Sequence, residues 1–70
     1  MKKITRRKAR KLYETNRPFV MVPGDYRPDS WAACLIDSRG HEDQDFDSLC
    51  NEFFYYNNEI SKCISFWCER

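Results

Sequence analysis

Hydrophobic residues recur with a helical period in one long segment and, more thinly, in another. Between Gln44 and Tyr56 they follow the i, i+3, i+4, i+7, i+8 spacing that collects them on one side of a helix: Phe46, Leu49, Cys50, Phe53 and Phe54. From Thr5 to about Asn16, a narrow apolar stripe faces a broad cationic arc, and Thr5 is a suitable N-cap. The pattern therefore predicts a core helix (44–56) and a more exposed basic helix (5–16).

Three short segments have the apolar and β-branched composition of strands. They are Phe19–Val22, Trp31–Ile36 and Cys63–Cys68. Alternation puts Phe66 and Trp67 on opposite faces of the last strand, whereas both faces of the second strand suit a core equally well. The order α-β-β-α-β predicts an α+β fold: one small domain over residues 1–70, with a three-stranded, mostly antiparallel sheet and both helices on one face. The other face would then expose Trp67.

Composition narrows the class of protein. The chain has 70 residues, including five Phe, four Tyr and two Trp, so core material is present although 33% of the residues are charged. No apolar segment approaches the roughly 18 residues that cross a bilayer, and no apolar stretch follows the basic N-terminus as in a signal peptide. We therefore expect a cytoplasmic protein without a membrane partner.

The four cysteines have apolar neighbours on the chain, as buried structural thiols do: Cys34, Cys50, Cys63 and Cys68. Since the predicted compartment is reducing, we expect reduced thiols, with two disulfides or a metal site as the alternatives. The chain has no C-x-x-C spacing, a single histidine (His41) and no glycine-rich phosphate loop. Accordingly, the sequence predicts no catalytic residues, no metal, no cofactor and no enzymatic activity.

Charge is divided sharply along the chain. Residues 1–17 carry eight basic side chains and one acid, while residues 25–59 carry nine acids and two basic side chains. A divided charge of this kind is typical of proteins that bind a polyanion or an acidic protein patch. The acids Glu42, Asp43, Asp45 and Asp47 lie at the start of the core helix, where the helix dipole favours each by roughly 0.3–1 kcal/mol at best. The dipole is a structural explanation for them. The alternatives are an acidic docking patch that includes Asp43 and Asp45, or mimicry of the charge of a nucleic acid.

The basic helix departs from the same rule, because Arg6, Arg7 and Lys8 occupy its first turn, where cations are unfavourable. Departures from local rules are frequent at functional sites. The candidate binding residues of this face are Arg6, Arg7, Arg10 and Lys11. The alternative is a solvated face that the acidic half of the same molecule neutralises. Tyr55, which lies off the core side of its helix, and Trp67 are candidate apolar anchors for a partner.

Three segments resemble small proteins of phages and other mobile elements: the KKITRRK start, DFDSLCNEFFYYN (45–57) and the terminal FWCE. In size and style the chain is similar to anti-CRISPR proteins, which are tiny, single-domain and non-catalytic. The resemblance is to a class and assigns no residue. It implies an inhibitor that binds a host defence complex, such as a CRISPR-Cas effector, or a nucleic-acid-handling complex in the host cytoplasm. A small nucleic-acid-binding regulator and a dimer module paired around Trp67 are the alternatives, and both a monomer and a homodimer stay open.

Overall fold

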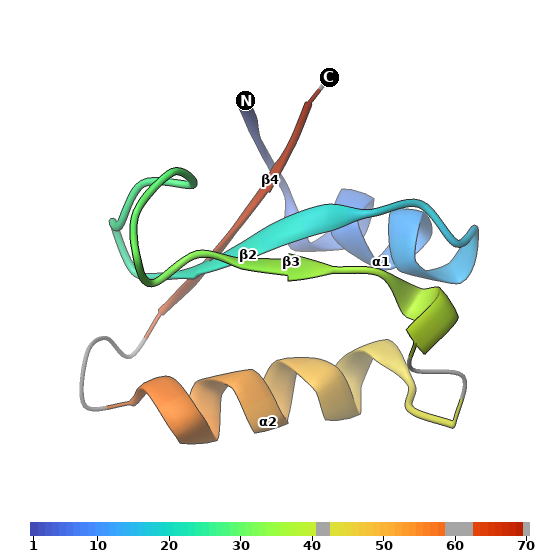
Figure 1. Ribbon diagram of the computed structural model, residues 1–70. Coiled ribbons are helices and arrows are strands. Elements are labelled where there is room, and N and C mark those ends of the chain that lie inside the picture. Colours follow the sequence, from blue (N-terminus) through green and yellow to red (C-terminus); the bar gives the residue numbers. More distant parts are fainter. Residues whose placement is uncertain (41–42, 59–62, 70) are drawn as a thin grey trace.

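The computed structural model describes residues 1–40, 43–58 and 63–69, so His41 lies outside the described residues. The elements follow in the order β1 (Lys2–Ile4), α1 (Arg6–Glu14), β2 (Phe19–Pro23), β3 (Cys34–Ile36), the short 3₁₀ turn η1 (Ser38–Gly40), α2 (Phe46–Asn57) and β4 (Ile64–Cys68). They form a small α+β fold with a four-stranded antiparallel sheet, in which α2 runs along one side of the strands (Figure 1).

The sheet has the strand order β1-β4-β2-β3, so the predicted number of three strands is wrong. The missing strand is β1, which pairs antiparallel with β4 in the register Lys2 with Cys68 and Ile4 with Phe66. Two lysines followed by one isoleucine show no run of strand-forming residues. Backbone pairing with β4, rather than any local preference, makes these residues a strand.

Each helix begins at an N-cap residue: Thr5 for α1, as predicted, and Asp45 for α2, which was predicted to begin at Gln44. The Thr5 hydroxyl oxygen accepts a hydrogen bond from the Lys8 backbone N–H (3.1 Å), and an Asp45 carboxylate oxygen accepts one from the Ser48 N–H (2.7 Å). Helix α1 ends at Glu14, two residues before its predicted end. The reason is that Asn16 adopts a left-handed conformation (φ 60°), which lets the chain leave the helix.

The hydrophobic core lies between the two helices and one face of the sheet, as predicted. Its buried residues are Ala9, Tyr13, Phe19, Met21, Ile36, Phe46, Leu49, Cys50, Phe66 and Cys68. The ring of Phe46 is central, with centroids 5.9 Å from those of Tyr13 and Phe66 and 6.2 Å from that of Phe19. In β3, Ile36 is buried and Leu35 is 71% exposed, which decides the face that the sequence left open.

The opposite face of the sheet is less open than predicted. Val20 and Val22 are buried, and Trp67 is only half-buried rather than fully exposed. The connection between β2 and β3 (residues 24–33) turns back on the side of the sheet away from α2 (Figure 1), and its residues 25–29 line a hollow together with Trp67. This connection, which the alternation of the strand could not reveal, covers part of the face.

The second predicted strand is too long at its start. Trp31–Ala33 lies in turns, because the Ala33 N–H donates to the Ser30 carbonyl (3.2 Å) and the Ser30 N–H to the Arg27 carbonyl (3.0 Å). Only Cys34–Ile36 pairs with β2. Apolar composition therefore overestimated the strand where local turns satisfy the backbone.

The cysteines divide into two kinds. Cys50 and Cys68 are buried as predicted, and burial raises the pKa of the Cys50 thiol. Cys34 and Cys63 are exposed, so the expectation that all four are buried is wrong for these two. In the part of the chain that the structure describes, no helix is long and apolar enough to cross a membrane.

Candidate interaction surface

The two helices meet through a cluster of charges around Asp47, in the first turn of α2. An Asp47 carboxylate oxygen lies 2.6 Å from Nη2 of Arg10 and 3.6 Å from Nη2 of Arg6. Both guanidinium groups also lie over the ring of Phe46, at 5.5 Å and 5.8 Å from its centroid. The Tyr13 hydroxyl donates to the Gln44 carbonyl (2.6 Å) and so joins α1 to the segment just before α2.

This cluster explains part of the unusual charge at the start of α1. Arg6 is a cation in a first turn that disfavours it, but Asp47 of the other helix supplies the compensating acid. Since all three side chains are about half-exposed, each ion pair contributes little, on the order of 0.2–1 kcal/mol. For Arg6 and Arg10, then, neutralisation within the molecule is the arrangement that the structure shows.

The other cations of the first two elements have no such partner among the residues that the structure describes. Five of them are exposed and form no ion pair with any described residue; together we call them the cationic surface: Lys2, Lys3, Arg7, Lys8 and Lys11. The cationic surface has one part on β1, Lys2 and Lys3, and another on α1, Arg7 and Lys11. Lys8 connects them, because it lies one helical turn from Lys11 and lines an open hollow of about 880 Å³ together with Lys2 and Lys3. The structure thus brings two predicted site residues, Arg7 and Lys11, together with three others.

Sequence reasoning did not propose Lys2, Lys3 and Lys8 as site residues. Their charge was apparent, but their common position depends on β1 lying against β4 and leading directly into α1. The basic KKITRRK segment was the available signal, and the strand within it was not predicted.

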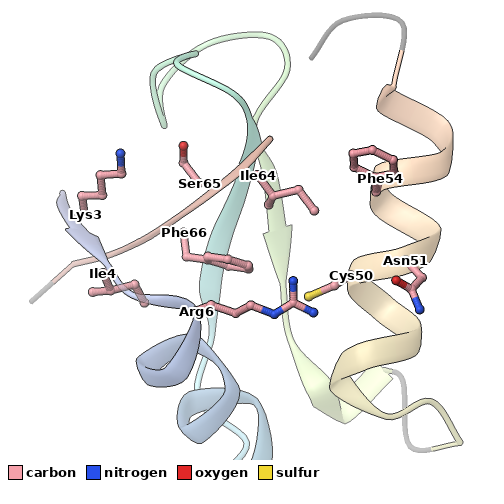
Figure 2. Close-up of a pocket in the computed structure, with 9 residues that line it drawn as sticks. All are labelled: Lys3, Ile4, Arg6, Cys50, Asn51, Phe54, Ile64, Ser65 and Phe66. Atoms are coloured by element: carbon pink, nitrogen blue, oxygen red, sulfur yellow. The ribbon is translucent and has the colours of Figure 1, made fainter. Parts of the chain in front are cut away.

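A second hollow, of about 420 Å³, opens between the β1–β4 pair and α2. Figure 2 shows the Arg6 side chain extending between Phe66 of β4 and Cys50 of α2. The rest of its lining is mixed, with the polar residues Lys3, Asn51 and Ser65 and the apolar residues Ile4, Phe54 and Ile64. We call the part of this hollow formed by Ile4, Phe54 and Ile64 the apolar groove. Lys3 and Ile4 line both hollows, so this apolar groove continues directly into the cationic surface.

The predicted apolar anchors lie elsewhere. Tyr55 is 72% exposed on α2, where its ring meets that of Tyr56 edge-on at 5.4 Å. Trp67 belongs to the sheet face opposite the helices, and its indole N–H is buried without an acceptor among the described residues. Neither residue is among those lining the two hollows beside the cationic surface.

The acidic candidates Asp43 and Asp45 are both exposed, and Asp45 has a clear structural role as the cap of α2. The hydrogen bond from the Ser48 N–H to the ionised carboxylate holds the pKa of Asp45 below its ordinary value. Because the folded-state pKa is lowered, Asp45 stabilises the fold above the pKa of the unfolded chain, and this stabilisation is lost as the pH falls through the folded-state value.

We therefore expect Asp45→Asn, which can still cap the helix but cannot titrate, to flatten the acid dependence of stability. The free energy of unfolding, measured by urea denaturation at several values between about pH 5 and pH 2, should fall less steeply than in the wild type. Asp43→Asn removes the same charge without removing the cap and is the control. Identical slopes for Asp45→Asn and the wild type would contradict this role.

The structure contains no group of three or more possible metal-ligating side chains within the residues it describes. Comparison with protein-family models, with curated proteins and with solved structures gives no match to this chain.

Proposed function

We propose that this protein is a non-catalytic interaction protein that binds an acidic region of a larger protein complex through its cationic surface. The proposal rests on a difference among the cations of β1 and α1. Arg6 and Arg10 form ion pairs with Asp47, whereas the five residues of the cationic surface have no acidic partner among the described residues. A small domain that neutralises some cations and leaves a contiguous set uncompensated has a surface suited to an external anion.

The apolar groove beside these cations favours a protein over a nucleic acid as the partner. A bound protein segment can place carboxylates on the lysines and an apolar side chain against Ile4 and Phe54 at the same time. The similarity in size and style to anti-CRISPR proteins supports a host defence complex, CRISPR-Cas-like or nucleic-acid-handling, as the partner, and inhibition as the result of binding.

Charge reversal at Arg7, Lys8 and Lys11 tests this proposal. We expect the triple variant R7E/K8E/K11E to lose the partner complex that the tagged wild type retains from nuclease-treated bacterial lysate. The fold should persist, because the acids introduced at positions 7 and 8 lie in the first turn of α1, where the helix dipole favours them and offsets the unfavourable acid at position 11 in the last turn. None of the three residues forms an ion pair with a described residue. Circular dichroism and thermal unfolding would verify that the variant is folded.

Arg27→Glu, a reversal on the connection between β2 and β3, is the matched control and should retain the complex. A folded triple variant that captures the same complex as the wild type would overturn the proposal. The earlier candidates Arg6 and Arg10 are less suitable for this test, since reversing them also breaks their contacts with Asp47 and Phe46.

A nucleic acid is the second candidate partner, and the continuity of the five cations favours it. If each contacts a phosphate, affinity for DNA or RNA should fall tenfold or more between about 50 and 200 mM salt. Material that is captured without nuclease and lost with it would support this function and contradict the first.

A further inference from the structure

The free edge of β1 is the feature that suggests how a partner would bind. In the order β1-β4-β2-β3, β1 pairs with β4 on one side, and no described strand lies on its other side. An edge of this kind presents backbone N–H and C=O groups to which an extended segment can add as a further strand. The hollow lined by residues 2–5 and Lys8 includes no residue of β4, so it lies on this free side of β1.

The charges along this edge indicate which strand would fit it. Lys2, Lys3 and Lys8 are exposed there, without an ion-pair partner among the described residues. Like charges opposite each other destabilise strand pairing, and opposite charges stabilise it. The edge therefore disfavours β1 of a second copy, which is equally basic, and favours an acidic strand.

The two edges of the sheet differ in charge, because only the β1 edge carries lysines. Strand β3 is the other edge strand, and its three residues, Cys34, Leu35 and Ile36, carry no charge. Lysines on an edge strand generally prevent indiscriminate pairing. The lysines of β1 also lie beside the apolar groove. An acidic segment that pairs with β1 can therefore make a second contact in this groove, which lysines that only prevent pairing would not require.

The register of β1 specifies the segment further. Successive side chains of a strand point to opposite faces, so Lys2 and Ile4 share one face and Lys3 lies on the other. A complementary strand would thus carry acidic residues opposite Lys2 and Lys3 and an apolar residue opposite Ile4, next to the groove.

We propose that an extended acidic segment of the partner protein adds to the free edge of β1 as a fifth strand, with its carboxylates on Lys2, Lys3 and Lys8. This inference rests on the proposed function and identifies the binding element of the same surface. It predicts that recognition needs the backbone of the segment as well as its charge.

The test uses the full chain and two peptides. The probe is an acetylated, amidated peptide of sequence TVEEVTV, and its control has the same side chains with every backbone nitrogen methylated, which removes the N–H donors of both edges and prevents pairing as a strand. We expect the probe to slow hydrogen exchange of at least one β1 amide tenfold or more by NMR, and to bind at least tenfold more tightly than the methylated peptide. K2E/K3E/K8E should abolish probe binding, whereas Arg27→Glu should change it less than threefold.

The outcomes separate this inference from the proposed function. Equal binding of the two peptides, or binding without protection of β1 amides, overturns strand addition while leaving electrostatic binding of an acidic partner intact. Failure of the probe to bind, with capture of the complex still dependent on Arg7, Lys8 and Lys11, likewise overturns strand addition alone. Pairing of β1 with a second copy, seen as a dimer whose mass is unaffected by the probe, would also overturn it.

Discussion

Phe46→Ala is expected to lower the free energy of unfolding by about 3–5 kcal/mol, the range typical for removing a buried phenylalanine ring. The side chain is 4% exposed, and its ring packs against those of Tyr13, Phe19 and Phe66. It also lies under the guanidinium groups of Arg6 and Arg10, so its removal opens a cavity and weakens the contact between the helices. With about 0.05–0.15 kcal/mol of stability per residue in ordinary domains, such a loss removes roughly a third or more of the free energy of unfolding of a 70-residue protein.

Urea denaturation followed by far-ultraviolet circular dichroism measures this loss. Phe54→Ala is the matched control: it is the same substitution in the same helix at a residue that is 40% exposed and outside the core cluster. We expect the control to cost less than half as much. Similar losses for the two variants would contradict the central position of Phe46 in the core.

We expect a large change in the affinity for an acidic partner when Asp47 is replaced, because the Asp47 carboxylate occupies the position beside Arg6 and Arg10 that a partner's carboxylate could take. Asp47→Asn releases Arg6 and Arg10, which then join the five residues of the cationic surface. We expect affinity for the acidic probe peptide to rise about three- to tenfold at low salt, because two further guanidinium groups become available to a carboxylate. Isothermal titration calorimetry at about 50 mM salt measures the change.

Stability should fall only slightly in this variant, by about 1 kcal/mol or less, because the ion pairs are half-exposed. Asp43→Asn alters the net charge by the same amount but is not within ion-pair distance of either arginine. An equal gain in affinity for Asp43→Asn would show that net charge, rather than release of Arg6 and Arg10, is responsible. A loss of affinity in Asp47→Asn would contradict the idea that Asp47 competes with a partner's carboxylate for Arg6 and Arg10.

Local signals were sufficient for the helices and for the strands β2 and β4. The caps Thr5 and Asp45 act within three residues of themselves, and the apolar period of α2 repeats over several turns. The alternation in β4 correctly placed Phe66 in the core and Trp67 on the other face. Each of these features depends on residues that are close together in the sequence.

The candidate site was predicted only in part. The excess of cations at the start of the chain indicated a basic surface, and Arg7 and Lys11 belong to it. Neutralisation by the acidic half of the molecule was an open alternative, and the structure shows it for Arg6 and Arg10 only. Which cations are neutralised could not be predicted, because Asp47 lies 41 and 37 residues further along the chain and approaches them only when α2 packs against α1.

The sequence by itself determined the α+β class, the two helices, the Thr5 cap, the core positions of Phe46, Leu49 and Cys50 in α2 and of Phe66 in β4, and the sign of the charge on α1. Only the tertiary structure decided that Lys2–Ile4 is a strand, that Ile36 rather than Leu35 is buried, and which cations have no acidic partner among the described residues. The physical reason is the range of the interactions. Capping and periodicity act over one or two helical turns, whereas strand pairing and ion pairs between elements join residues that are distant in the chain and leave no pattern in either segment alone.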